Sequence, residues 1–103
     1  MGRSVAGFEE EFASYHGSRH CIGVDNGTNA LMLSLRAVGI CTGDEVITVA
    51  NTAAPTVVVI NSIGTQPVLV DIEGNGSYLI DLSKFEEDIR PKTDPTHVIW
   101  TQP

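Results

Sequence analysis

The sequence predicts an α/β fold, a three-layer domain built on a mostly parallel sheet. Two observations lead to this prediction. Short apolar segments typical of buried strands alternate along the chain with segments of helical periodicity. The clearest strand candidate, residues 45–49, is apolar and β-branched almost throughout, as is typical of parallel strands covered on both faces. Such alternation indicates repeated βα units, in which helices connect successive parallel strands.

The first predicted helix covers residues 8–15. Its apolar residues Phe8, Phe12 and Tyr15 are spaced by four and three, with three consecutive glutamates between the first two. This spacing predicts an amphipathic helix whose acidic residues form a solvated face. Gly17 follows as the expected helix stop.

The next three segments complete the first half of the chain. Residues 21–24 are apolar and predict the first buried strand. Residues 29–38 predict a second helix, with apolar side chains on more than one face, so we expect other structure to cover most of it. A turn at residues 42–44 then leads into the strand at 45–49.

Residues 51–63 carry two competing signals. The valine-rich run at 57–60 favours a strand by propensity. Pro55 suits a first helical turn, Gly64 suits the residue after a helix, and parallel strands on both sides require a crossover. We therefore predict a helix here, followed by a strand at 65–70.

The last third of the chain begins with a turn at residues 73–78, where Asn-Gly could also close a small hairpin. A helix is expected at 82–89, with Asp81 or Ser83 as its N-cap. A final strand is expected at 96–101.

Composition and charge exclude two classes of partner. The chain has 103 residues, enough for one small domain, and its net charge is −7, with six scattered Lys and Arg and no basic cluster. Binding to nucleic acid is therefore not expected. The longest apolar run, residues 57–60, is far shorter than the roughly 20 residues of a membrane span. The N-terminus has no apolar signal region, which predicts a cytoplasmic protein.

The cysteines and histidines do not predict a metal site. Cys21 and Cys41 lack CxxC spacing and lie beside apolar residues, so we expect two reduced, buried thiols. His16 and His20 flank the predicted helix stop and His97 is far downstream, so they do not form a helical metal-binding pair.

The turn between the predicted strand at 21–24 and the helix after it is the candidate binding site. A tight strand-to-helix turn directs free backbone N–H groups at one point, where the helix dipole also favours negative charge. Gly27 would allow close approach of a phosphate, and the Thr28 hydroxyl could donate to it. Spacing alone favours an ordinary Asn-Gly turn in which Thr28 is only an N-cap.

Five segments, in order, resemble the DegT/DnrJ/EryC1/StrS aminotransferases. They are the helix at 8–17, Asn-Gly-Thr-Asn-Ala-Leu at 26–31, Gly-Asp-Glu-Val-Ile at 43–47, Ala-Asn-Thr at 50–52, and Pro-Val-Leu-Val-Asp-Ile at 67–72. The resemblance extends over nearly the whole chain. It implies part of the large domain of fold type I, whose members use pyridoxal 5′-phosphate (PLP).

The family resemblance also implies a function and site residues. Members typically transfer an amino group from glutamate or glutamine to a keto group on a nucleotide-linked sugar, as homodimers. Gly27, Thr28 and Asn29 match the turn that holds the PLP phosphate. Ala53 matches a position where many members carry an aromatic ring stacked on the pyridine, so here the sequence departs from the pattern.

The family's catalytic residues are not found among these 103 residues. The Schiff-base lysine and the acid that pairs with the pyridine nitrogen lie downstream in the family, so the resemblance assigns no catalytic residue here. Lys84 and Lys92 read as solvated surface residues, and Asp71 matches the strand before the missing acid. We therefore expect residues 1–103 to be an N-terminal part of the PLP-binding domain, inactive in isolation.

Two other interpretations stay open at this point. The same turn would serve a non-catalytic α/β module that binds a phosphate or nucleotide, or a regulatory relative of the family. The chain could also be barely folded, with an exposed strand edge near residues 98–100.

Overall fold

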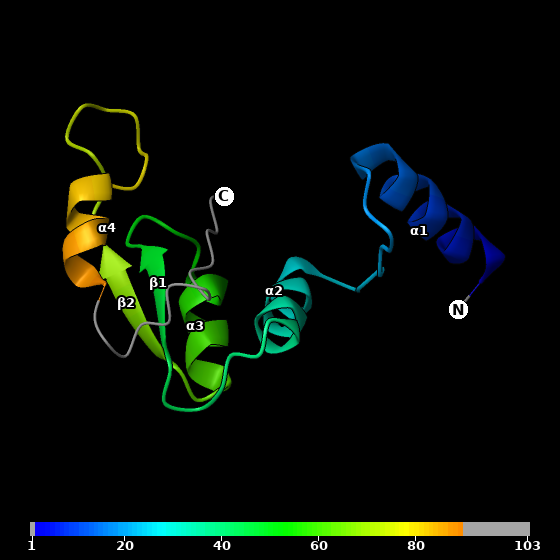
Figure 1. Ribbon diagram of the computed structural model, residues 1–103, viewed down its shortest axis with the longest axis horizontal. Helices are drawn as coiled ribbons and strands as arrows, with labels where there is room; N and C mark the ends of the chain where they lie inside the picture. Colours follow the sequence, from blue (N-terminus) through cyan, green and yellow to red (C-terminus); the bar gives the residue numbers. More distant parts are fainter. Residues whose placement is uncertain (1, 90–103) are drawn as a thin grey trace.

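The computed structural model describes residues 2–89 of the chain. Its elements, in order, are α1 (Arg3–His16), α2 (Gly27–Ala37), β1 (Glu45–Val49), α3 (Ala54–Ser62), β2 (Gln66–Val70) and α4 (Leu82–Asp88) (Figure 1). These elements confirm all four predicted helices, and two of the predicted strands. The strand expected at 96–101 lies outside the described residues.

The centre of the fold is a parallel pair of strands, β1 and β2, joined by α3. Their register places Val46 opposite Pro67 and Val49 opposite Val70. Parallel strands need a crossover, and α3 provides it, so the helical interpretation of residues 51–63 is confirmed. Pro55 lies in the first turn of α3, and Gly64, just past its end, has a φ of 81°.

Both faces of this sheet are covered, which gives the three layers that the sequence predicts. Side chains alternate along β1, so Val46 points to one face and Ile47 and Val49 to the other. The first face packs against α2 and α3, in a cluster of Leu35, Ile40, Val46, Val59 and Ile60. The second packs against α4 and the segment before it, in a cluster of Ile47, Val49, Val70 and Ile80.

The segment between β2 and α4 folds back on itself as a small antiparallel excursion. Ile72 and Ile80 form an isolated antiparallel bridge, and the amide of Glu73 donates to the carbonyl of Leu79 at 2.9 Å. Gly76 turns the chain with a φ of 80°. The hairpin that the Asn-Gly pair suggested is therefore present in minimal form.

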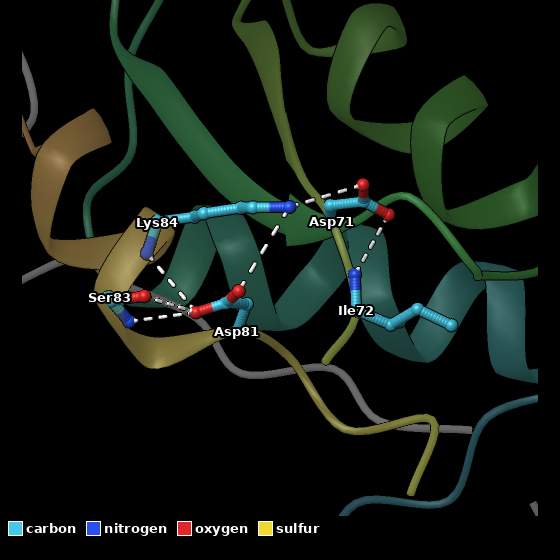
Figure 2. Close-up of polar contacts among 5 residues, drawn as sticks. All are labelled: Asp71, Ile72, Asp81, Ser83 and Lys84. Atoms are coloured by element: carbon cyan, nitrogen blue, oxygen red, sulfur yellow. Dashed lines mark hydrogen bonds and ion pairs between the residues drawn. The ribbon is translucent and has the colours of Figure 1, made fainter. Parts of the chain in front are cut away.

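Helix α4 begins with a side-chain cap on Asp81, one of the two predicted candidates. One Asp81 carboxylate oxygen accepts hydrogen bonds from the Ser83 hydroxyl at 2.6 Å, the Ser83 amide at 3.1 Å and the Lys84 amide at 3.4 Å. Figure 2 shows the Lys84 side chain reaching from α4 towards the carboxylates of Asp81 and Asp71. The helix that this cap begins packs Phe85 against the cluster on the second face of the sheet.

The strand predicted at residues 21–24 is wrong. The segment is irregular, and the side chain of Ile22 is 77% exposed and that of Val24 41% exposed. Among the described residues, β1 and β2 pair only with each other, so no neighbouring strand offers a hydrogen-bonding ladder to this segment. The Gly23 amide donates instead to the Glu9 carboxylate, at 2.6 Å.

The two N-terminal helices are more exposed than their sequences predict. In α1 the apolar stripe of Phe8, Phe12 and Tyr15 is exposed, because this helix lies apart from the sheet (Figure 1). In α2, Leu35 is fully buried but Leu33 is half exposed. The expectation that other structure covers most of α2 is therefore wrong, since α3 and β1 cover one side of it.

The expectation of two buried thiols is wrong for Cys41. Cys41 is exposed and Cys21 is partly buried. The chain at Cys41 forms the turn before β1, where its amide donates to the Asp44 carboxylate at 2.8 Å. Its apolar neighbour Ile40 is buried in the α2–α3–β1 cluster, whereas the Cys41 side chain itself is exposed, so an apolar neighbour in the sequence did not predict burial of this thiol.

Truncation of Leu35 should destabilise the fold strongly. Leu35→Ala removes the most deeply buried side chain of the α2–α3–β1 cluster and should lower the free energy of unfolding by about 2–5 kcal/mol. Leu33→Ala, on the same helix but half exposed, is the matched control, with an expected loss of about 0.5 kcal/mol or less. Urea unfolding followed by circular dichroism measures both. Equal losses would contradict this packing.

The cap of α4 should depend on pH. The Ser83 hydroxyl is the largest of the influences that hold the pKa of Asp81 below its usual value. Because the folded pKa lies below the unfolded value of about 3.9, the cap stabilises fully above that pH. Its contribution is lost as the pH falls through the folded pKa.

Carbon-detected NMR titration of the Asp81 carboxyl group measures this shift directly. Ser83→Ala should raise the pKa of Asp81 towards its usual value, and Asp81→Asn should cap α4 with no titration at this position. An Asp81 carboxyl that titrates at or above the usual value in the unsubstituted chain would contradict the cap.

Candidate functional site

The turn before α2 is closed by Asn26, which the sequence analysis did not single out. Asn26 is the N-cap residue in extended conformation, and its side-chain oxygen accepts a hydrogen bond from the Asn29 amide at 2.9 Å. Thr28 therefore lies inside the first turn of the helix, and the interpretation of Thr28 as a plain N-cap is wrong. The available signal was an asparagine three residues before Asn29, since asparagine is a preferred N-cap.

Two backbone donors at the start of α2 are left open. The first N–H groups of a helix have no partner within the helix itself. Here the Asn29 amide is bound by the Asn26 side chain, whereas the Gly27 and Thr28 amides have no hydrogen-bond acceptor within residues 2–89. A Cβ built on Gly27 would meet nothing within 4 Å, so no described atom crowds the side of Gly27 on which a side chain would stand.

These donors have the chemistry of an anion site. They lie at the positive end of the α2 dipole, where two adjacent amides can donate to the oxygens of one phosphate. The Thr28 side chain adds a hydroxyl, which can donate to the same group. The start of α2 thus presents two open amides and the Thr28 hydroxyl, groups that can bind an anion.

Asn29 stabilises the turn itself. Its side-chain amide donates to the Asp25 carboxylate at 2.7 Å, while its backbone amide is bound by Asn26. Both contacts run back to the residues that precede the helix. Asn29 therefore supports the shape of the cradle, and its polar groups are not the ones left open for a ligand.

Ala53 is the N-cap residue of the next helix, α3, as Asn26 is of α2. It follows β1 and forms the N-cap of α3, in extended conformation and exposed. The turn is closed by Thr52 and Thr56, whose hydroxyl oxygens are 3.1 Å apart. The methyl group of Ala53 offers no aromatic surface. Helices α2 and α3 share one core cluster, so the two turns belong to the same layer of the fold.

Lys84 is a surface residue, as the sequence analysis expected. Its side chain is 49% exposed, and its ammonium group lies 3.4 Å from the Asp71 carboxylate and 4.0 Å from that of Asp81. Asp71 itself is exposed at the end of β2 and accepts a hydrogen bond from the Ile72 amide (Figure 2). Exposed ion pairs of this kind contribute little to stability.

Residues 2–89 contain neither a metal-binding group of side chains nor a helix that could span a membrane. This part of the chain holds no group of three His, Cys, Asp or Glu side chains arranged to bind a metal ion. None of its helices has the length and apolar character needed to cross a membrane.

Comparison with known proteins identifies the family. Residues 1–102 match the model of the DegT/DnrJ/EryC1/StrS aminotransferase family. The chain is 50% identical over 101 residues to dTDP-3-amino-3,4,6-trideoxy-alpha-D-glucose transaminase of Micromonospora megalomicea subsp. nigra, covering 95% of this chain and 27% of that protein. It is 44% identical over 99 residues to dTDP-3-amino-3,6-dideoxy-alpha-D-galactopyranose transaminase of Aneurinibacillus thermoaerophilus, covering 96% and 27%.

The fold agrees with this assignment. The PLP form of Spr1654 from Streptococcus pneumoniae superimposes on the chain with a TM-score of 0.84 and 31% sequence identity, over 90% of this chain and 24% of that one. The chain thus spans about a quarter of the length of the relatives that it matches. The chain belongs to the DegT/DnrJ/EryC1/StrS aminotransferase family.

Proposed function

We propose that these residues are part of a PLP-dependent aminotransferase that acts on a nucleotide-linked keto sugar. The observation that carries the proposal is the open start of α2, where the Gly27 and Thr28 amides lie within the turn that resembles the family's phosphate-binding motif. The two relatives described above are named as dTDP-sugar transaminases, which supports this substrate class. Glutamate or glutamine is the proposed amino donor.

The residues present are suited to the phosphate group of the cofactor. Bound PLP supplies the electron sink on which transamination depends. In this proposal the Gly27 and Thr28 amides and the Thr28 hydroxyl bind the phosphate. Asn29 holds the turn through Asp25 and Asn26. The dianionic phosphate is favoured there by the α2 dipole.

Ala53 is proposed to lie beside the pyridine ring without stacking on it. Its exposed methyl group would leave this face of the pyridine ring more open than an aromatic side chain would. Alternatively, another group covers this face. By resemblance to the family, we also propose a cytoplasmic homodimer for the protein as a whole. Size-exclusion chromatography with light scattering measures that assembly.

Phosphate binding at the start of α2 is directly testable. In a ¹⁵N-labelled chain, titration with PLP and with inorganic phosphate should shift the Gly27 and Thr28 amide resonances, whereas pyridoxal, which has no phosphate, should not. Thr28→Ala should weaken PLP binding about tenfold, because it removes a hydrogen bond to a charged group.

Ser34→Ala, further along the same helix, is the matched control and should bind PLP like the unsubstituted chain. The Ser34 hydroxyl donates to the Ala30 carbonyl within α2, away from the helix start. Unshifted Gly27 and Thr28 resonances at saturating PLP, or equal affinity in Thr28→Ala, would contradict the proposed phosphate site.

The isolated chain should not form a specific covalent adduct with PLP. Its only lysines are Lys84 and Lys92, and Lys84 is held in an exposed ion pair with Asp71. Incubation with PLP and borohydride, followed by peptide mass spectrometry, should show only sparse, unselective labelling. A stoichiometric adduct on one lysine, accompanied by transaminase activity, would overturn this prediction.

The gene beyond codon 103 tests the proposal for the whole protein. A continuing reading frame with a lysine and an acid in the family's downstream positions is expected. A stop codon there, with a stable monomeric product, would favour the alternative function of a non-catalytic phosphate- or nucleotide-binding module.

A further inference from the structure

The chain between α1 and α2 is held by few contacts. Residues 21–24 form no strand, and the side chains of Ile22 and Val24 are exposed. Among the described residues, the backbone of this segment makes a single hydrogen bond, from the Gly23 amide to a carboxylate oxygen of Glu9 at 2.6 Å. That oxygen lies 3.2 Å from where a Cβ would stand on Gly23, so glycine permits the close approach.

Glu9 differs in this respect from its two neighbours. The sequence predicts that the three consecutive glutamates form one solvated face. In the structure Glu10 and Glu11 are exposed, but Glu9 is partly buried and faces Gly23. A carboxylate that accepts from a backbone amide forms a short, charge-assisted hydrogen bond, and such bonds are stronger than neutral ones.

The other end of the same connection is held by Asn29. Its side chain binds Asp25, and its backbone amide binds the Asn26 side chain. The connection therefore has one anchor at Gly23 and another at Asp25 and Asn26. The open amides begin at Gly27, directly after the anchor at Asp25 and Asn26. The anchor at Gly23 therefore restricts the direction from which the chain enters α2.

We propose that Glu9 is a positioning residue for the start of α2. By holding the Gly23 amide, its carboxylate fixes the path of the chain into the turn and so the direction of the Gly27 and Thr28 amides. Without this bond the connection would be held only at Asp25 and Asn26, and the additional ordering needed on ligand binding would weaken binding. The predicted loss of phosphate affinity rests on the function proposed above. The predicted change in the direction of the Gly27 and Thr28 amides in the ligand-free chain does not.

NMR of the ligand-free chain tests the positioning role. Glu9→Ala should speed hydrogen exchange of the Gly23 amide about tenfold and shift the Gly27 and Thr28 amide resonances. Glu9→Gln keeps a side-chain oxygen that can accept from Gly23, so it should restore all three signals. Glu11→Ala, on the same helix and with the same loss of charge, is the matched control and should leave them unchanged.

The outcomes separate this inference from the proposed function. Gly27 and Thr28 resonances that stay unshifted in Glu9→Ala would overturn the inference, whatever the affinity for phosphate. So would a collapse of the β1 and β2 signals, because Glu9 would then stabilise the whole fold. Unchanged Gly23 exchange, or a failure of Glu9→Gln to restore the signals, would also overturn it.

A phosphate titration of the same variants gives the second readout. Glu9→Ala should weaken inorganic phosphate binding about five- to tenfold, the size expected for one lost hydrogen bond. Glu9→Gln and Glu11→Ala should bind like the unsubstituted chain. If the unsubstituted chain shows no phosphate-dependent shift, the proposed function fails, while the ligand-free measurements still decide the role of Glu9.

Discussion

The parallel pairing of β1 with β2 is the constraint on which the rest of this fold depends. Two parallel strands cannot be joined by a tight turn, so the residues between them must cross back over the sheet, and α3 does so. The same crossover places apolar side chains over one face. The alternation along β1 sends Ile47 and Val49 to the opposite face, where α4 and the Ile72–Ile80 bridge cover them.

Among the described residues, two of the helices begin with a side-chain N-cap. Asn26 and Asp81 are both N-caps, and each uses a side-chain oxygen to bind amides of the first helical turn. The Asp81 carboxylate accepts hydrogen bonds from the amides of both Ser83 and Lys84, so these two amides are not available to a ligand. Within residues 2–89, the Asn26 cap binds only the Asn29 amide and leaves both the Gly27 and the Thr28 amides open, so this helix start can accept an anion.

Family membership and geometry contribute different parts of the functional argument. The family match covers residues 1–102, and the two relatives described above are named as dTDP-sugar transaminases. The geometry adds which groups at the start of α2 can donate, and it assigns Asn29 a supporting role beside them. It also shows that Ala53 offers only a methyl group at the neighbouring helix start, the position that we propose lies beside the pyridine ring.

The sequence by itself determined the order of most elements, because local patterns dominate there. Proline at one end and glycine past the other marked α3 despite its valine run, and the family motif located the turn at Gly27 and Thr28. Only the tertiary structure decided burial and partners. Residues 21–24 look like a strand by composition but have no described neighbour to pair with, and Phe8 and Cys41 are exposed. Whether a strand finds a partner and whether a side chain is covered depend on segments distant in the chain, and no local pattern contains that information. The hydrogen bond between Glu9 and Gly23 also joins two separate segments, so the sequence pattern did not reveal it.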